Sequence, residues 1–249
     1  MTGKRRDIRL LYRMATARQN SDLGMAEIDR RLALLRTIVA PDTTIDIAVP
    51  EEGPVVIESR TDSALAVPEL LRGVVAAEKQ EYDGVVFSCF GDPGIDAARE
   101  LVRIPVVSSG QSSMHVAAQL GSRFSILSPG SGGGGRARDN PLKYGFQQSY
   151  ASTRGVGMSV MDLNRDREGT LNQLVRVGEQ CIDEDRADTL ILGCLSMAFH
   201  DVAGELSARL GIPVVNPVHA SIALAELLVH SSTAHSKIAY PVPRERGND

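Results

Sequence analysis

The chain presents a cysteine twice in the same local setting, and this duplication limits what it can fold into more than any other feature. An aspartate opens the short apolar run that ends at Cys89, and another opens the run that ends at Cys194, with the same spacing in both copies. A predicted helix and then the sequence Ile-Pro-Val-Val follow each cysteine, at 104–107 and at 212–215. Self-similarity of this kind predicts two structurally equivalent lobes.

Apolar runs of strand length alternate with amphipathic runs of helix length along the chain. A β-branched strand is predicted at 44–49, a helix at 63–80, and further on a helix at 141–150 and a strand at 156–163. Alternation of this kind is typical of βαβ units with parallel sheets. The predicted fold class is therefore α/β: two pseudo-symmetric lobes, each a parallel sheet flanked by helices, with the active site in the cleft between them. From about residue 231 the polar sequence predicts a tail.

Composition and charge exclude several classes of protein. The formal net charge of −4 over 249 residues leaves no basic surface for nucleic acid. No apolar run approaches the roughly 18 residues that a membrane-spanning helix needs, so no membrane partner is expected. With three cysteines and no secretion signal, we expect reduced thiols and a cytoplasmic protein.

The two repeated cysteines are the first candidates for chemistry. Both Cys89 and Cys194 follow an apolar strand, at the end where open α/β sheets bind ligands. Both precede a predicted helix, whose N-terminal N–H groups favour a thiolate. The alternative is that they pack as small buried hydrophobes, the role we assign to Cys181 inside a predicted helix.

The turn after Cys89 has a sequence suited to helix initiation or to anion binding. Asp92 followed by proline predicts an N-cap and the first position of a helix. The N–H groups of Gly91, Asp92 and Gly94 can also face an anion or a developing oxyanion, although a merely structural tight turn is an equal alternative. Histidines 115, 200 and 219 are interpreted as packed or solvated side chains.

Motifs for a bound cofactor are missing from the sequence. No His/Cys cluster has zinc-ligand spacing, and no Gly-x-Gly-x-x-Gly follows a strand, so neither a metal nor another cofactor is expected. The glycine-rich stretch at 130–135 lacks the Gly-Lys-Ser/Thr ending of a phosphate-binding loop, and we interpret it as a flexible loop or lid.

A separated pair of thiols suits proton transfer at carbon better than redox chemistry, because redox pairs usually lie close in sequence. One thiolate removes an α-proton, and the opposite thiol protonates the other face of the planar intermediate. A free thiol has a pKa of about 8.5, near enough to neutrality for both protonation states to be reached. We expect backbone N–H groups of the turns after the cysteines to meet the charge on the carbonyl oxygen, at Phe90, Gly91 and Asp92 and at Leu195 and Ser196.

The run Cys89-Phe-Gly-Asp-Pro-Gly, together with Met114-His115 and Gly193-Cys194, resembles the aspartate/glutamate racemase superfamily and most closely its hydantoin racemases. The resemblance implies a cofactor-independent homo-oligomeric racemase with one catalytic cysteine in each lobe. It also implies that the final helix returns to the first lobe. The predicted lobes are therefore 1–107 with 215–249, carrying Cys89, and 108–214, carrying Cys194.

The chain departs from the family's pattern where substrate is held. The family's Asn-Pro-Asn turn after the first strand is replaced by a segment containing Arg13, and an acidic residue of the family is replaced by Gln111. Arg13 is a candidate ligand for a carboxylate or carbonyl, with a surface arginine as the equal alternative.

The sequence thus predicts a racemase or epimerase of hydantoin-like cyclic ureides or related amino-acid derivatives. The enzymatic alternatives are a decarboxylase or a cis-trans isomerase that uses a cysteine. A non-catalytic small-molecule binding protein is the alternative of another class.

Overall fold

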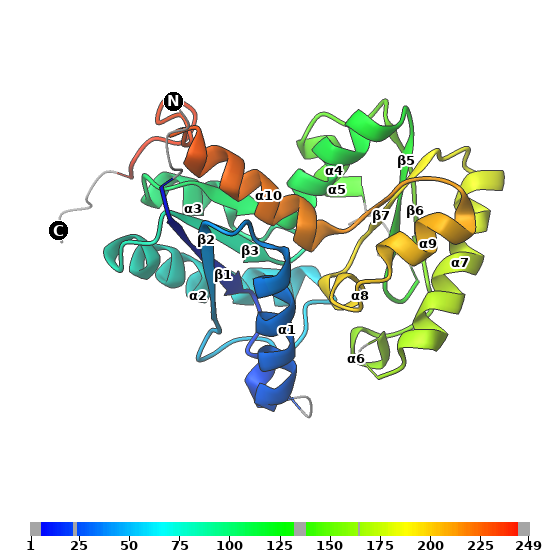
Figure 1. Ribbon diagram of the computed structural model, residues 1–249, viewed down its shortest axis with the longest axis horizontal. Coiled ribbons are helices and arrows are strands. Elements are labelled where there is room, and N and C mark those ends of the chain that lie inside the picture. Colours follow the sequence, from blue (N-terminus) through cyan, green and yellow to red (C-terminus); the bar gives the residue numbers. More distant parts are fainter. Residues whose placement is uncertain (1–5, 22–23, 132–137, 164, 244–249) are drawn as a thin grey trace. The chain divides into compact units, whose positions relative to one another are not determined.

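The computed structural model describes residues 6–21, 24–131, 138–163 and 165–243 (Figure 1). Its contacts divide the chain into two compact units. The first comprises the described residues up to Ser88, Pro93–Val107 and those from Ile222 onward, and the second comprises Cys89–Asp92 and Ser108–Ser221. The turn that begins at Cys89 is therefore grouped with the second unit, although the strand before it belongs to the first.

The first sheet is parallel, with strand order β2-β1-β3-β4. Its strands and neighbouring helices are β1 Ile8–Met14, η1 Arg18–Asn20, α1 Gly24–Ile38, β2 Thr43–Ala48, α2 Arg60–Lys79, β3 Gly84–Ser88, α3 Ile95–Leu101 and β4 Val106–Ser108. The final helix, α10 Pro217–His230, is grouped with the second unit up to Ser221 and with the first from Ile222 onward.

The second sheet is also parallel, with order β6-β5-β7-β8. The two sheets therefore have the same topology: numbered along the chain within each sheet, the strands lie in the order second, first, third, fourth. This confirms the predicted fold class of two equivalent parallel sheets flanked by helices. The elements here are α4 Ser109–Leu120, β5 Phe124–Ser128, α5 Asp139–Lys143, β6 Tyr150–Gly155, α6 Val160–Leu163, α7 Arg167–Asp183, β7 Thr189–Leu192, α8 Leu195–Ala198, α9 Ala203–Leu210 and β8 Val214–Val215.

The repeat extends to hydrogen bonds at the strand starts. The carboxylate of Asp83, just before β3, accepts a bond of 2.8 Å from the N–H of Arg9 in β1. The carboxylate of Asp188, just before β7, accepts one of 3.0 Å from the N–H of Arg123 beside β5. Both aspartates thus mark equivalent strand starts, as predicted.

Both faces of the second sheet are buried, which is usual for parallel strands. Leu190 and Leu192 of β7 belong to a core cluster that contains residues of α7 and α9. Ile191, between them, points to the other face and belongs to a cluster with Met114 of α4 and Phe124 of β5. The two-residue period of a strand explains this division.

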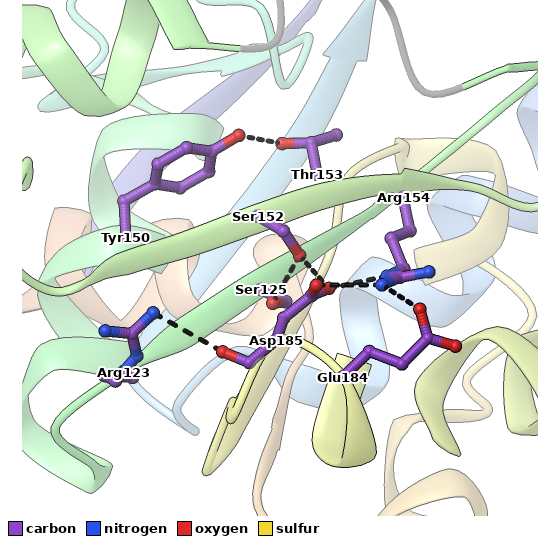
Figure 2. Close-up of polar contacts among 8 residues, drawn as sticks. All are labelled: Arg123, Ser125, Tyr150, Ser152, Thr153, Arg154, Glu184 and Asp185. Carbon is purple, nitrogen blue, oxygen red and sulfur yellow. Dashed lines mark hydrogen bonds and ion pairs between the residues drawn. The ribbon is translucent and has the colours of Figure 1, made fainter. Parts of the chain in front are cut away.

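Strand β6 is where the sequence prediction fails. The predicted helix at 141–150 and strand at 156–163 are wrong, because the chain forms the short helix α5 and then a strand at Tyr150–Gly155. Ser152, Thr153 and Arg154 of β6 have polar, half-buried side chains that hydrogen-bond to neighbours (Figure 2). Ser152 Oγ donates to Asp185 at 2.5 Å, and Arg154 binds the same carboxylate through Nε at 2.5 Å and Nη2 at 2.8 Å. Hydrophobic periodicity does not detect an edge strand stabilised in this way.

The predicted tail is instead fixed to the first unit. The edge N–H of Val106 in β4 donates to His235 Nε2 at 2.8 Å, and Lys237 Nζ donates to the carbonyls of Arg99 and Val102 at 2.6 Å each. Burial, with the nearby Arg99 guanidinium, lowers the pKa of His235 to about 4. A neutral imidazole therefore covers the sheet edge, and an ammonium group binds the last carbonyls of α3.

Candidate active site

Cys89 directly follows β3 and is half-buried. The turn behind it closes with a hydrogen bond of 3.1 Å from the N–H of Asp92 to the carbonyl of Cys89, and Asp92 has a positive φ of 49°. The predicted N-cap at Asp92 is wrong, because α3 begins at Ile95 and its cap is Gly94, which has no side chain to accept a bond.

Asp92 instead serves a different helix. Its carboxylate accepts bonds of 2.9 Å from the N–H groups of Gly110 and Gln111 in the first turn of α4, and a third of 2.9 Å from the hydroxyl of Tyr144. Burial raises the pKa of Asp92 to about 6, although these bonds oppose the rise. The carboxylate therefore joins the turn after Cys89 to the start of α4.

Phe90, between the thiol and this carboxylate, is held at its backbone and its ring. The carbonyl of Phe90 accepts a bond of 3.2 Å from Asn140 Nδ2, and its ring packs on the core cluster that contains Met114 and Phe124. A Cβ at Gly110 would lie 2.2 Å from that carbonyl oxygen. Only glycine therefore allows α4 to approach the turn this closely.

Cys194 reaches its helix without an intervening turn. It is half-buried, has an extended backbone, and is itself the N-cap of α8. Gly193 before it donates its N–H to the carbonyl of Leu127 at 2.7 Å, and a Cβ there would lie 2.6 Å from the same oxygen. The next residues, Leu195 and Ser196, are 6% and 2% exposed.

Arg13 of β1 is buried, with 5% of its surface exposed, so the surface alternative is wrong. Its Nη2 donates to the carbonyl of Glu69 at 2.7 Å and lies 3.3 Å from the Glu69 carboxylate. A Cβ at Gly73 of α2 would lie 2.1 Å from Arg13 Nε. Burial lowers the pKa of Arg13 despite this partner. The carboxylate that Arg13 meets thus belongs to the protein itself.

The histidines singled out in the sequence have ordinary surroundings. The ring of His115 is exposed and stands edge-on to Phe146 at 5.0 Å. His219 lies 3.5 Å from the carboxylate of Asp201, with 44% of its side chain exposed. His200 hydrogen-bonds through Nε2 to a backbone carbonyl.

The third cysteine has the structural position that was predicted. Cys181 is fully buried in α7, and burial raises the pKa of its thiol to about 11. A thiol with that pKa stays protonated at neutral pH, so Cys181 is unsuited to the chemistry expected of the other two.

Within the second unit the fold gathers most of the predicted site residues: the Cys89 turn, Gln111 at the start of α4, and Cys194 with the first residues of α8. Arg13 belongs to the first unit. The sequence reasoning missed Asn140 and Tyr144, since a lone amide and a lone tyrosine carry no periodic signal. Of the glycine-rich stretch, Gly130 donates its N–H to Met158 at 2.8 Å, whereas residues 132–137 lie outside the described ranges.

Two kinds of feature are not found among the residues that the structure describes. None of their His, Cys, Asp and Glu side chains form a group of three or more that could hold a metal ion. No helix in these ranges has both the length and the apolar character needed to cross a membrane.

Several known proteins that are similar to this chain are named racemases. A family model described as Asp/Glu/Hydantoin racemase matches residues 26–225. The hydantoin racemase of Pseudomonas sp. (strain NS671) is 34% identical over 206 residues, which cover 82% of each chain. That of Paenarthrobacter aurescens is 34% identical over 211 residues, covering 84% of this chain and 89% of the relative.

Solved structures similar to this chain include further racemases. The allantoin racemase from Klebsiella pneumoniae superimposes with a TM-score of 0.86 and 29% identity, covering 97% of this chain and 96% of that one. The glutamate racemase from Francisella tularensis subsp. tularensis SCHU S4, at 14% identity and a TM-score of 0.59, covers 92% and 84% and shares the fold.

Proposed function

Since this chain belongs to the Asp/Glu/hydantoin racemase family, and is therefore an isomerase of the racemase type, we propose that it inverts the α-carbon of hydantoin-like cyclic ureides with two cysteines and no cofactor. The membership confirms the resemblance seen at Cys89-Phe-Gly-Asp-Pro-Gly. The substrate class and the two-thiol mechanism are the proposal.

One observation carries the mechanism. Cys89 follows β3 and Cys194 follows β7, and these are the equivalent third strands of two sheets with the same strand order. The carboxyl ends of parallel strands are where such sheets place ligands. The third cysteine, Cys181, lies inside α7 and is buried, so the fold distinguishes the repeated thiols from the unrepeated one.

The proposed reaction needs no net change in the enzyme's protons or electrons. The thiolate of one cysteine takes the α-proton, and the C–H electron pair moves toward the adjacent carbonyl to give an enolate. The thiol of the other cysteine then protonates the opposite face and becomes the thiolate. Reaction of the opposite enantiomer, or proton exchange with water, restores the starting state.

The negative charge of the enolate needs hydrogen-bond donors. We propose that backbone N–H groups of the residues after the cysteines supply them, namely Phe90 and Gly91 in the turn after Cys89, and Leu195 and Ser196 at the start of α8. The N–H of Asp92 already donates to the carbonyl of Cys89, which leaves the earlier residues of that turn as the better candidates.

The relatives' names support the proposed substrate class. Hydantoin racemases and allantoin racemases are named for five-membered cyclic ureides that carry the stereocentre beside a ring carbonyl, which acidifies its proton. We propose that this chain accepts such rings. Arg13 is a poor candidate for holding the ring, because its guanidinium is already paired with the carboxylate of Glu69 in α2.

The experiment is a racemisation assay on single enantiomers of 5-substituted hydantoins, including allantoin, followed by polarimetry. Wild type is expected to racemise at least one ring, and Cys89→Ser and Cys194→Ser are each expected to lose at least about a hundredfold in rate, because general acid–base groups contribute on that order. Cys181→Ser is the matched control and should keep its activity. Racemisation by wild type that survives in either variant contradicts the two-thiol mechanism, and failure with every ring contradicts the substrate class.

A further inference from the structure

The turn that carries Cys89 is held by side chains that the reaction itself does not require. We propose that Asp92 and Tyr144 are positioning residues that fix the Cys89 thiol, through a hydrogen-bonded connection from α5 to the turn and to the start of α4. The catalytic meaning of this role rests on the proposed function of Cys89, whereas the connection itself can be tested without any substrate.

The backbone of the turn is the first part of the argument. Asp92 has a φ of 49°, in the left-handed region that residues other than glycine adopt at some cost in free energy. Its N–H closes the turn on the carbonyl of Cys89. A Cβ at Gly91 would lie 3.7 Å from Cys89 Sγ, so the sulfur faces the backbone of its own turn. Movement of this turn therefore changes the surroundings of the sulfur.

The carboxylate of Asp92 is the second part. It is 4% exposed, and both of its oxygens accept bonds: Oδ1 from the N–H of Gly110, and Oδ2 from the N–H of Gln111 and the hydroxyl of Tyr144. Three donors converge on one buried group, and their hydrogen bonds offset part of the free-energy cost of burying it. The carboxylate is thus committed to internal partners and acts on the thiol only through the turn.

Helix α5 supplies the third part. Tyr144 directly follows α5 and reaches the carboxylate, and Asn140 within α5 reaches the carbonyl of Phe90 at 3.2 Å. Lys143 lies with its ammonium 5.2 Å from the centre of the Tyr144 ring. The two residues that bind the turn therefore come from one short segment, four positions apart.

Removal of the Tyr144 hydroxyl has a predictable electrostatic result. The groups that face the carboxylate are the N–H groups of Gly110 and Gln111 from α4, the Ser108 side chain before that helix, and the Tyr144 hydroxyl with Lys143 on the far side of its ring. Each hydrogen bond favours the ionised form, so the loss of one raises the pKa of Asp92 further above its present value of about 6. In that variant the Asp92 carboxylate is therefore protonated at pH values at which the Cys89 thiol reacts.

The test measures alkylation of each cysteine by iodoacetamide between pH 5 and 9, quantified peptide by peptide, in wild type, Tyr144→Phe and Tyr150→Phe. Tyr150→Phe is the matched control, because it also removes one hydroxyl bond in the same unit, the 2.9 Å contact with Thr153 (Figure 2). We expect the wild-type Cys89 rate to show an inflection near pH 6 that the Cys194 rate lacks. Tyr144→Phe should move this inflection to higher pH, while Tyr150→Phe leaves it unchanged.

The steady-state counterpart is a fall in kcat of about threefold to tenfold for Tyr144→Phe with little change in KM, since a hydrogen bond of ordinary net strength is lost. If Tyr144→Phe does not fold, Asn140→Ala replaces it; this variant should change the Cys89 alkylation rate at least about twofold and leave the Cys194 rate unchanged. Identical Cys89 profiles in Tyr144→Phe and Tyr150→Phe would overturn the proposal. If the wild type racemises no ring but Tyr144→Phe still moves the Cys89 inflection, the proposed function is wrong and the positioning role stands.

Discussion

The two cysteines follow equivalent strands, yet the chain leaves those strands in different ways. After Cys89 comes a closed turn whose carboxylate is bound by α4 and by Tyr144, and the next helix, α3, starts only at Ile95. After Cys194 the helix starts at once, and the cysteine is its N-cap. The difference teaches that the repeat preserves the position of the thiol, while each thiol depends on different neighbours.

The largest expected effects on stability come from two glycines, Gly110 against the Cys89 turn and Gly193 directly before Cys194. At Gly110 an added Cβ would lie 2.2 Å from the carbonyl of Phe90, and at Gly193 it would lie 2.6 Å from that of Leu127. Gly110→Ala and Gly193→Ala should each destabilise the protein by about 1–3 kcal/mol, because a well-packed site resists added volume. Urea unfolding measures this, and Gly204→Ala in α9, where an added Cβ meets nothing within 4 Å, is the control.

Cysteine alkylation of the same variants tests whether the surroundings of Cys89 and Cys194 are independent. Gly110→Ala should alter the alkylation rate of Cys89 but not that of Cys194, and Gly193→Ala should do the reverse. If either substitution changes both rates equally, the two thiols depend on the same neighbours, and the contrast between the Cys89 turn and the start of α8 is wrong.

Asp92→Asn tests the Cys89 turn with a smaller change. The amide has one acceptor oxygen where the carboxylate has two, so at least one donor among Gly110, Gln111 and Tyr144 loses its partner, at about 1–3 kcal/mol. The pH dependence has a definite sign. Asp92 has a pKa of about 6 in the fold and about 3.8 when unfolded, so wild-type stability falls as the pH rises between these values. The difference in unfolding free energy between wild type and Asp92→Asn, measured by urea unfolding, should therefore narrow from pH 4 to pH 6. A difference that widens would contradict a raised pKa for Asp92.

His235→Gln in the first unit should show the opposite sign with a smaller effect. The imidazole has a pKa of about 4 in the fold, below its unfolded value of about 6.5, so its contribution is complete above pH 6.5 and declines as the pH falls toward 4. Glutamine keeps an acceptor for the N–H of Val106 but does not titrate. Its stability gap to wild type should widen from pH 4 to pH 6.5 in denaturant titrations. A gap that is flat with pH would mean that His235 is not buried as a neutral acceptor.

The sequence was enough to predict the structure where its pattern is repeated or periodic. The strands that end at Cys89 and Cys194, the strand starts at Asp83 and Asp188, and the parallel α/β class all follow from apolar runs and their duplication. Prediction from the sequence failed where polar side chains hydrogen-bond to residues far away in the chain. Strand β6 has a polar face satisfied by Asp185, and the tail is fixed through His235 and Lys237.

Asp92 shows why such partners escape prediction. Asp followed by proline is a good local signal for a helix start, but the carboxylate caps α4, 18 residues further on, because the turn brings it to Gly110. The partly buried ion pair between Arg13 and Glu69, 56 positions apart, could not be predicted for the same reason. Local sequence patterns indicate which polar groups need a hydrogen-bond or ion-pair partner, and the tertiary fold determines which residue supplies it.

The central claim is that two thiols serve opposite faces of one carbon, and early-time deuterium incorporation in D2O tests it most directly. A single enantiomer of a hydantoin that the wild type racemises is converted to a few per cent, and both enantiomers are then recovered and analysed by mass spectrometry. Two thiols predict deuterium in the inverted product and protium in the recovered substrate, since the proton that is removed and the one that is delivered belong to different sulfurs. Equal deuterium in both enantiomers, or product that retains the substrate's own proton, would mean that one group serves both faces and would contradict the account.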